Sequence, residues 1–236
     1  MRTPITPHPP QMASPGGKTP PAPVARLVVG DLISTTSSTV VIADAATAVE
    51  PEVQDVPPDR VLCVVVCGAG PAGDVGRLVT LGQARGWVVQ LVATPSALPF
   101  LDTVELRAQT GMPVRSNYLA PGQHRSQRAE AVVVAPATYN TISKCALGIS
   151  DTYALGVLAE AIGLPIPVVM LPFVNSALAN RRPFERAVVQ LRHEGVRVLV
   201  GEGGVEPHPA GAGGEYIKSF PWHLALDALD QVAQEG

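Results

Sequence analysis

The sequence predicts an α/β domain built on a parallel β-sheet, and three observations support this prediction. Residues 61–66, 131–134 and 168–171 are continuous apolar runs, which are typical of strands buried on both faces of a sheet. Each run is followed by a turn that contains glycine, or proline and asparagine. Residues 184–193 have the apolar spacing of a helix. Strands that turn directly into helices are characteristic of α/β folds.

Composition divides the chain of 236 residues into two parts. Residues 1–25 contain eight prolines and few large apolar side chains, so we expect them to be disordered. Residues 26–45 are richer in β-branched residues and are compatible with a hairpin, a tail or a translation start placed too far upstream. We therefore predict a proline-rich, disordered N-terminal extension over residues 1–58 and a single folded domain over residues 59–236.

Charge and cysteine content exclude several classes of partner. The formal net charge is −3 and the arginines are dispersed, so we expect no nucleic-acid partner. No stretch approaches the roughly 20 apolar residues of a membrane span, and no signal segment precedes the domain. We therefore expect no membrane partner and a cytoplasmic location. Cys63, Cys67 and Cys145 fit a reducing compartment, and their spacing predicts no metal site. Since the first two lie in or next to an apolar strand, we assign them to core packing.

The first strand leads into a glycine-rich turn. Residues 68–73 read Gly-Ala-Gly-Pro-Ala-Gly, which satisfies the G-x-G-x-x-G pattern of a nucleotide-binding loop before a helix. A dinucleotide site also needs an acidic residue about 20 residues later, but the second strand, residues 87–93, contains none. This disfavours NAD or FAD bound in the usual way, whereas the phosphate of a mononucleotide can still bind to such a turn.

The second strand ends in the turn Thr94-Pro95-Ser96. Hydroxyl groups at the start of a helix suit phosphate oxygens. Ser96 has two interpretations, a cap of the helix that follows or a phosphate ligand, and the sequence favours neither.

The third and fourth strands end in turns that contain proline followed by asparagine. Residues 131–134 lead into the sequence PATYNT at 136–141, and residues 168–171 lead into PFVN at 172–175. Open α/β sheets bind their ligands at the carboxyl ends of the strands, so these turns predict a ligand site. An ordinary βα turn with a polar cap is the alternative for the first of them.

These two turns resemble the motifs of the flavin-containing cysteine decarboxylases, the family of phosphopantothenoylcysteine decarboxylase and the epidermin-type peptidyl-cysteine decarboxylases. The first family motif reads Pro-Ala-Ser-Ala-Asn-Thr. The second reads Pro-x-Met-Asn-x-x-Met-Trp, of which this chain keeps the proline and the asparagine. The resemblance covers about residues 60–203 in matching order. It implies a three-layer α/β/α, flavodoxin-like (Rossmann-like) single domain, FMN as the cofactor, and a homo-oligomer that is a trimer or a dodecamer.

The resemblance also assigns roles to individual residues. Asn140 and Asn175 match the two asparagines that the family uses around the substrate. His124, which lies 12 residues before Pro136, is the candidate for the family's catalytic base, and a surface histidine in a polar stretch is the alternative. FMN is expected to contact residues of the first three turns, namely Gly68, Ala69, Gly70, Thr94, Ser96, Phe100, Pro136, Ala137, Thr138 and Thr141.

The activity that the resemblance implies is oxidative decarboxylation of a C-terminal cysteine, or of another cysteine-containing substrate. Val174, Leu178 and Ala179 replace the methionines and the tryptophan of the second motif, which argues against the phosphopantothenoyl substrate. Family members that finish with a saturated thiol use a cysteine in the flap after the last strand, and no cysteine follows Cys145, so an enethiol product is expected. The alternatives are a flavin prenyltransferase of the same fold and a non-catalytic flavin-binding subunit.

The segment after the last predicted strand, residues 201–223, is rich in glycine and proline, and we expect it to form a flap over the site. Pro221-Trp222-His223 at its end either closes on a substrate or anchors the final helix, residues 224–233. Anchoring is favoured, because a large aromatic side chain beside the start of a helix usually packs.

Overall fold

The computed structural model describes residues 60–118, 128–164 and 166–235. All of them belong to the unit Gln54–Gly236, the second of two units into which the chain divides. The N-terminal extension predicted over residues 1–58 lies outside the described residues. So does His124, the candidate base.

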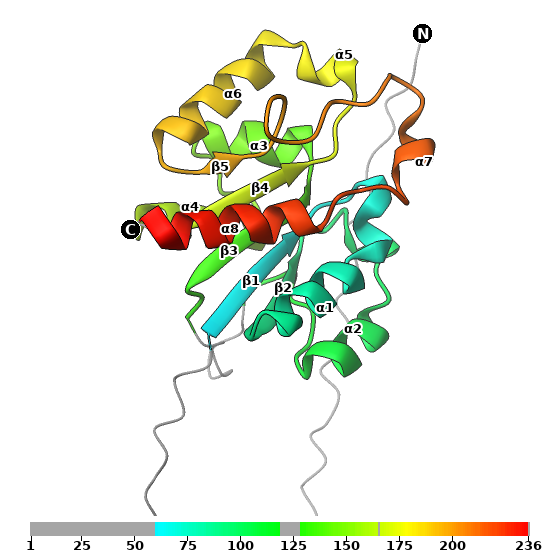
Figure 1. The fold of residues 1–236 in the computed structure, drawn as a ribbon, viewed down its shortest axis with the longest axis vertical. Helices are drawn as coiled ribbons and strands as arrows, with labels where there is room; N and C mark the ends of the chain where they lie inside the picture. Colours follow the sequence, from blue (N-terminus) through cyan, green and yellow to red (C-terminus); the bar gives the residue numbers. More distant parts are fainter. Residues whose placement is uncertain (1–59, 119–127, 165, 236) are drawn as a thin grey trace, which may run out of the picture. The chain divides into compact units, whose positions relative to one another are not determined.

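The core of the domain is a five-stranded sheet in which every pair of neighbouring strands is parallel. The strand order is β2-β1-β3-β4-β5, as Figure 1 shows. The predicted parallel α/β sheet is therefore confirmed. The strands are β1 (Arg60–Val66), β2 (Trp87–Ala93), β3 (Ala131–Ala137), β4 (Val168–Pro172) and β5 (Arg197–Val198).

The last strand is short, although residues 196–200 read Val-Arg-Val-Leu-Val and are rich in β-branched residues. Its ladder with β4 spans Arg197 and Val198, and the backbone N–H of Leu199 still donates to the carbonyl of Met170. Val200 pairs instead with Val205, because the chain turns back on itself at residues 201–204, where Gly201 and Gly203 adopt positive φ angles. This turn begins the predicted flap, residues 201–223.

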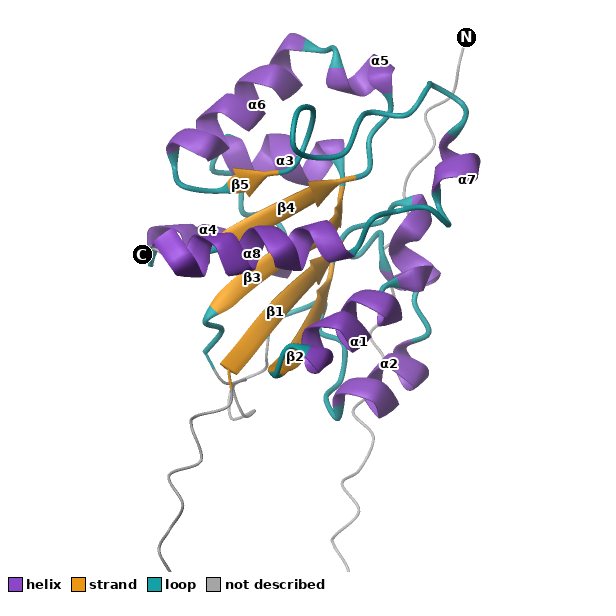
Figure 2. Cartoon of the chain, in the orientation of Figure 1, coloured by secondary structure: helices purple, strands orange, loops and turns teal. Residues whose placement is uncertain are grey.

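Helices cover both faces of the sheet (Figure 2). Side chains of β1 alternate between the two layers, because successive residues of a strand point to opposite faces. Leu62, Val64 and Val66 belong to the cluster that includes α1 and α8, whereas Cys63 and Val65 belong to the cluster that includes α3, α4 and α6. This confirms the three-layer α/β/α, flavodoxin-like architecture. The helices are η1 (Gly70–Asp74), α1 (Gly76–Ala84), η2 (Leu98–Phe100), α2 (Thr103–Thr110), α3 (Tyr139–Ala146), α4 (Tyr153–Gly163), α5 (Ser176–Ala179), α6 (Arg182–His193), α7 (Gly213–Tyr216) and α8 (His223–Glu235).

Local sequence explains where these helices begin and which side they bury. Asp102 caps α2 by accepting hydrogen bonds from the N–H groups of Val104 and Glu105, and Thr152 caps α4 by accepting one from Leu155. Helix α6 buries the spaced apolar residues Phe184, Ala187, Val188 and Leu191, which is the stripe of an amphipathic helix.

Trp222 anchors the final helix, as the sequence favoured. Its side chain is 2% exposed and meets the ring of Phe220 edge-on, with the ring centroids 4.8 Å apart. Helix α8 is further tied to α1 by Arg85, which forms ion pairs with Asp227 and Asp230. The alternative, in which Trp222 closes on a substrate, is therefore wrong, because the side chain is buried in the core.

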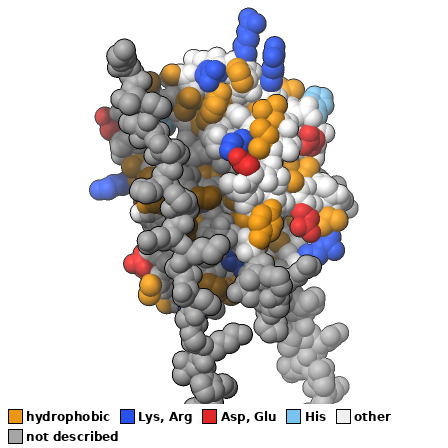
Figure 3. Space-filling model, turned by 180° about the vertical axis from the view of Figure 1, so that it is seen from behind, with side chains coloured by type: hydrophobic (Ala, Val, Ile, Leu, Met, Phe, Trp, Pro, Cys, Tyr) orange, Lys and Arg blue, Asp and Glu red, His pale blue; other side chains and the backbone are white. Residues whose placement is uncertain are grey.

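The surface carries charges of both signs. On the face in Figure 3, lysine and arginine side chains are dispersed among acidic ones over the described residues. In these parts of the chain, no helix combines the length and the apolar character that a bilayer crossing requires.

The two cysteines at β1 are core residues, as predicted. Cys63 is 4% exposed and Cys67 is fully buried. Burial raises the pKa of the Cys63 thiol from 9.0 to about 12, and it also raises the pKa of the Cys67 thiol. Both groups are therefore neutral at physiological pH.

We predict that replacing Cys63 with valine reduces the alkaline loss of stability. An unfolded chain releases the thiol proton above pH 9, whereas the folded chain retains it until about pH 12. The free energy of unfolding therefore falls across this interval, by about 1.4 kcal/mol per pH unit for one thiol. Urea denaturation at pH 8 and pH 10.5 should show a smaller fall for Cys63→Val than for the wild type. Val65→Ala, on the same strand and face, should lower stability without changing the dependence on pH. An equal fall in Cys63→Val and the wild type would contradict the prediction.

Candidate functional site

Four loops meet where strands β1 to β4 end, and we call this region the carboxyl edge. Because the sheet is parallel, every one of these strands ends at the same edge, and Figure 1 shows their arrowheads there beside η1 and α7. Hydrogen bonds link the loops to one another. The N–H of Cys67 donates to the carbonyl of Pro136 at 3.2 Å, that of Thr94 to Val66 at 2.9 Å, and that of Phe173 to Ala137 at 2.9 Å.

The loop after β1 packs against two other segments at its glycines. A methyl group on Gly68 would overlap the backbone carbonyl of Ser96, and one on Gly70 would lie 2.9 Å from Cγ1 of Ile217. Packing against backbone therefore requires glycine at residue 68, whereas a side chain at residue 70 would require the Ile217 side chain to shift. The N–H of Ala69 donates to the carbonyl of Cys67 at 2.9 Å. This N–H group is therefore used within the loop.

The helix that follows the glycine turn begins differently from the prediction. The residues Gly70–Asp74 form the 3₁₀ helix η1, with Pro71 in its first turn, and α1 begins only at Gly76. A proline in the first turn has no N–H to offer. The number of N–H groups aimed at a bound phosphate is accordingly smaller than in the usual nucleotide-binding loop.

The loop after β2 presents a pair of hydroxyl groups. Oγ1 of Thr94 and Oγ of Ser96 lie 3.2 Å apart. Thr94 is buried and Ser96 is exposed, so Thr94 orients a hydroxyl that faces solvent. The following 3₁₀ helix η2 has Ala97 at its N-cap and no side-chain cap. The capping interpretation of Ser96 is therefore wrong, and its hydroxyl is available to a ligand. Phe100, at the end of η2, is 48% exposed.

Helix α3 begins at Tyr139, directly after the loop that follows β3. Thr138 is the N-cap of α3, and its Oγ1 accepts a hydrogen bond from the N–H of Thr141 at 3.3 Å. The alternative of a polar cap is thus confirmed for Thr138. Pro136 and Ala137 are buried beneath it, whereas Asn140 is exposed on the first turn.

A short chain of hydrogen bonds fixes the threonines of this loop. Cys67 Sγ donates to Oγ1 of Thr141 at 3.2 Å, and this oxygen lies 3.1 Å from Oγ1 of Thr138. The raised pKa of Cys67 keeps the thiol protonated, so it is a donor. Thr138 also forms hydrogen bonds with the Cys67 thiol, so these three side chains form one connected cluster at this loop.

The loop after β4 carries the second asparagine. Oδ1 of Asn175 accepts a hydrogen bond from the N–H of Leu178 at 2.9 Å, so Asn175 is the N-cap of α5. Since the oxygen is already used, the amide N–H groups are the part of this side chain that remains for a ligand. Strands β3 and β4 are neighbours, so Asn140, in the first turn of α3, and Asn175, in the loop after β4, follow adjacent strands.

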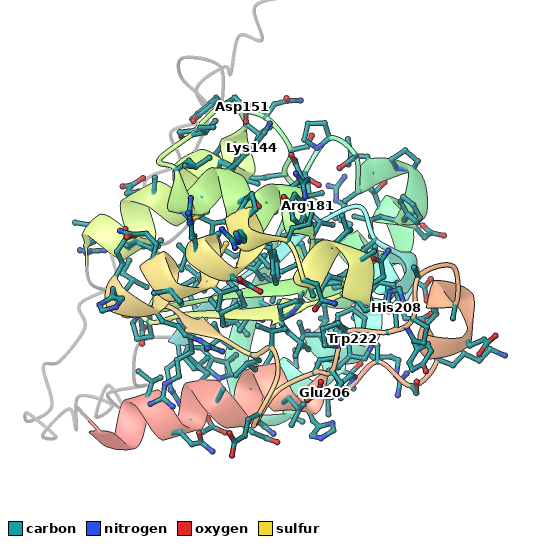
Figure 4. All side chains as sticks on the ribbon, turned by 90° about the horizontal axis from the view of Figure 1, so that it is seen from above. Lys144, Asp151, Arg181, Glu206, His208 and Trp222 are labelled. Carbon is teal, nitrogen blue, oxygen red and sulfur yellow. The ribbon has the colours of Figure 1, made fainter. Side chains whose placement is uncertain are left out.

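The flap is docked on the carboxyl edge. His208 forms a parallel bridge with Asn175, in which the N–H of Ser176 donates to the His208 carbonyl at 2.8 Å. The His208 ring lies against Phe173, with 4.7 Å between centroids, and against Tyr216, at 5.6 Å. Figure 4 shows His208 on the flap, near its short helical turn. His208 was not among the residues predicted for the site. The only signal for it was a histidine between two prolines, Pro207 and Pro209.

A separate cavity of about 760 Å³ lies on the α4 side of β1 and β2, away from this site. Its lining includes Cys63, Arg115, Tyr118, Tyr153 and Glu160, and none of the residues predicted for the ligand site. The convergence of four loops with hydroxyl and amide groups, rather than the size of this cavity, therefore identifies the site.

The chain shows sequence similarity to known proteins. Residues 50–213 match the family model described as Flavoprotein. The coenzyme A biosynthesis bifunctional protein CoaBC of Mycobacterium tuberculosis (strain ATCC 25618 / H37Rv) is 31% identical over 116 residues, which are 47% of this chain and 27% of that protein. The chain thus spans less than a third of the length of the curated relatives that it matches.

Two solved structures of FMN-dependent cysteine decarboxylases are also similar. SpaF is 26% identical, with a TM-score of 0.52, over 59% of this chain and 83% of SpaF. TvaF from thioviridamide biosynthesis is 25% identical, with a TM-score of 0.55, over 71% of this chain and 96% of TvaF.

Proposed function

The chain belongs to the flavoprotein family, and on this premise we propose that it is an FMN-dependent decarboxylase of a cysteine-containing substrate. The substrate that we favour is a peptide with a C-terminal cysteine, and the product is an enethiol. The observation that carries the proposal is that Asn140, in the first turn of α3, and Asn175, in the loop after β4, follow adjacent parallel strands.

FMN is the cofactor, and the residues at the carboxyl edge suit it. SpaF and TvaF, which the chain resembles, are FMN-dependent. Phosphate oxygens accept hydrogen bonds, and the Thr94 and Ser96 pair offers an exposed hydroxyl beside a backbone loop. The exposed ring of Phe100 is available to pack against a flat heterocycle.

The roles of the protein in the reaction follow from these groups. When bound, FMN supplies the two-electron oxidation of the substrate thiol, which activates the adjacent carbon for loss of carbon dioxide. Asn175 donates its amide N–H to the substrate carboxylate while its oxygen caps α5. A neutral donor suits a carboxylate that leaves as uncharged carbon dioxide. Asn140 is exposed on the neighbouring loop and forms the other side of the same site.

Two further parts of the proposal concern residues beyond this loop pair. His124 is proposed as the base that receives the thiol proton, or else as a surface histidine, and it lies outside the described residues. We also propose a homo-oligomer, a trimer or a dodecamer, because the family motifs that the chain carries belong to proteins of that kind. Light scattering of the purified protein measures its mass in solution.

A two-stage experiment tests the proposal. The first measurement is the absorption spectrum of the purified protein and the mass of any released chromophore, for which we expect FMN at about one per chain. The second is mass spectrometry of peptides that end in cysteine, incubated with the FMN-loaded protein. We expect a loss of about 46 mass units, corresponding to carbon dioxide and two hydrogens. A peptide that ends in serine is the control and should not change.

The outcomes separate the alternatives. A flavin altered by a dimethylallyl phosphate would indicate a prenyltransferase. Bound FMN with neither peptide nor flavin changed would indicate a non-catalytic flavin-binding subunit. A colourless protein that does not bind added FMN would contradict the proposal as a whole.

A further inference from the structure

The five-stranded sheet has two outer edges, one at β2 and one at β5. An outer strand carries N–H and C=O groups that no neighbouring strand uses, and another chain can pair with them. At β2, a loop segment of the chain takes this place in part. The N–H of Ala93 donates to the carbonyl of Arg115 at 2.7 Å, and the N–H of Arg115 donates to the carbonyl of Leu91 at 3.0 Å. Among the residues that the structure describes, no other strand pairs with the outer side of β5.

The ladder between β4 and β5 fixes which groups of β5 face outward. Val198 is the ladder partner of Met170, and the N–H of the next residue, Leu199, donates to the carbonyl of Met170 at 2.9 Å. In a parallel pair, successive residues of a strand direct their N–H and C=O groups alternately to the two sides. Since Leu199 faces β4, Val198 and Val200 direct their groups to the outer side. Figure 1 shows β5 at the border of the sheet, near α6.

The side chain of Arg192 occupies this outer side. Nη2 of its guanidinium donates to the carbonyl oxygen of Val198 at 2.7 Å and to that of Val200 at 3.1 Å. This nitrogen carries two hydrogens, so each carbonyl receives one of them. The N–H of Val200 is used as well, since it donates to the Val198 carbonyl at 3.1 Å. Most of the groups that a further strand would need are therefore already used within the chain.

The turn between α6 and β5 brings Arg192 to this place. Helix α6 ends at His193, and the N–H of Gly195 donates to the carbonyl of Arg192 at 3.1 Å. Gly195 adopts a φ of 86°, which glycine tolerates without strain, so the chain reverses within a few residues. Arg192 is exposed, and its planar donor group suits two neighbouring acceptors. The cation also lies in the last turn of α6, where the helix dipole favours positive charge.

The edge borders a cavity and has a sequence that suits pairing. The cavity measures about 600 Å³, and its lining includes Arg192, Val198, Glu202 and residues of α8. Residues 196–200 read Val-Arg-Val-Leu-Val, and β-branched residues of this kind are enriched in strands. Short segments of high β-propensity at a sheet edge tend to pair with the same segment of another copy, unless their hydrogen-bonding groups are covered.

From these contacts we infer that Arg192 closes the outer edge of the sheet and thereby keeps two copies of this chain from pairing β5 against β5. Without the guanidinium, the carbonyls of Val198 and Val200 would be available to the N–H groups of a second copy. Two copies related by a twofold axis would then join their sheets into one, because such an axis brings the same strand of each copy together. The inference concerns an interaction surface that Arg192 keeps closed, and it is independent of the proposed function.

Sedimentation velocity of Arg192→Met is the first test. Methionine keeps an unbranched stem on the helix and removes the donors. We expect material of about twice the wild-type mass or more, in a fraction that rises with protein concentration by mass action. Arg186→Met removes the same charge from an exposed position on the same helix, so this matched control should sediment like the wild type. A wild-type mass for Arg192→Met at every concentration overturns the inference.

A strand probe separates an opened edge from a loss of the fold. A fluorescein-labelled peptide Val-Arg-Val-Leu-Val copies residues 196–200, and the control peptide is Val-Arg-Pro-Leu-Val, because proline cannot donate to a ladder. In fluorescence anisotropy, the first peptide should bind Arg192→Met at least about 10-fold more tightly than the wild type, the effect of about one net hydrogen bond. The proline peptide should bind neither protein. Equal affinity of the first peptide for both proteins, or equal binding of both peptides to Arg192→Met, overturns the inference.

Discussion

Replacing Asn175 with aspartate is expected to slow decarboxylation by about 100-fold or more, equivalent to about 2.7 kcal/mol of transition-state stabilisation, with little change in the stability of the fold. The reason is that the two atoms of the amide have separate tasks. The oxygen caps α5 by accepting the Leu178 N–H, and aspartate caps helices as well as asparagine does. The nitrogen is the donor that we assign to the substrate carboxylate. Aspartate replaces it with a second acceptor, which carries negative charge and repels a carboxylate.

Three variants separate the two tasks. Asn175→Asp should retain FMN and unfold at the same urea concentration as the wild type. Asn175→Ala should lose both activity and about 1 kcal/mol of stability, because the cap is also removed. Asn180→Asp makes the same chemical change at an exposed position at the other end of α5 and should change neither property. Turnover of the cysteine-ended peptide and urea denaturation are the two measurements. Full activity in Asn175→Asp would rule out the donor role.

Replacing Trp222 with alanine is expected to lower the free energy of unfolding by about 3–5 kcal/mol, the cost of removing a large aromatic side chain from a core. The side chain is 2% exposed and packs in the layer that contains α1 and α8. Its contact with Phe220 ties the end of the flap to the start of α8. Removing it therefore opens a cavity and loosens both segments.

Trp222→Phe is the informative comparison. In the part of the chain that the structure describes, the buried Nε1–H of Trp222 has no hydrogen-bond partner, and an unpaired buried donor costs about 1–3 kcal/mol. Phenylalanine deletes this donor and keeps an aromatic ring against Phe220. We expect it to change stability by about 1 kcal/mol or less, because the lost volume and the relieved donor oppose each other. Urea denaturation measures both variants. A loss below about 1 kcal/mol in Trp222→Ala would contradict the anchoring role.

Much of the fold could be predicted because it depends on local patterns. The runs at 61–66, 131–134 and 168–171 are apolar at every position, and a strand of this kind has to be covered on both faces. Helix α6 likewise carries its apolar residues along one side, and an amphipathic helix of this kind buries that side against the core. The alternation of these segments then leaves a parallel sheet between two helical layers. These inferences need no contact between distant residues.

The site could be predicted in part for the same reason. The turns with Asn140 and Asn175 follow directly from strands, and parallel strands end at one edge, so their proximity was predictable. The role of Ser96 was not predictable, because its hydroxyl could equally well have capped the helix that follows. Only the structure shows that Ala97 is the N-cap of η2 and that Ser96 pairs with Thr94.

The sequence by itself determined a parallel α/β fold with strands covered on both faces, and the order of the turns predicted to bind a ligand, since both follow from the apolar runs and from the residues at which strands end. Only the tertiary structure decided how the loops touch. It showed that Gly68 accommodates the backbone of Ser96, that the Cys67 thiol orients Thr141, and that the flap brings His208 to Asn175. The physical reason is that these contacts join segments from different strands. Such contacts depend on how whole elements pack, which no local sequence pattern specifies.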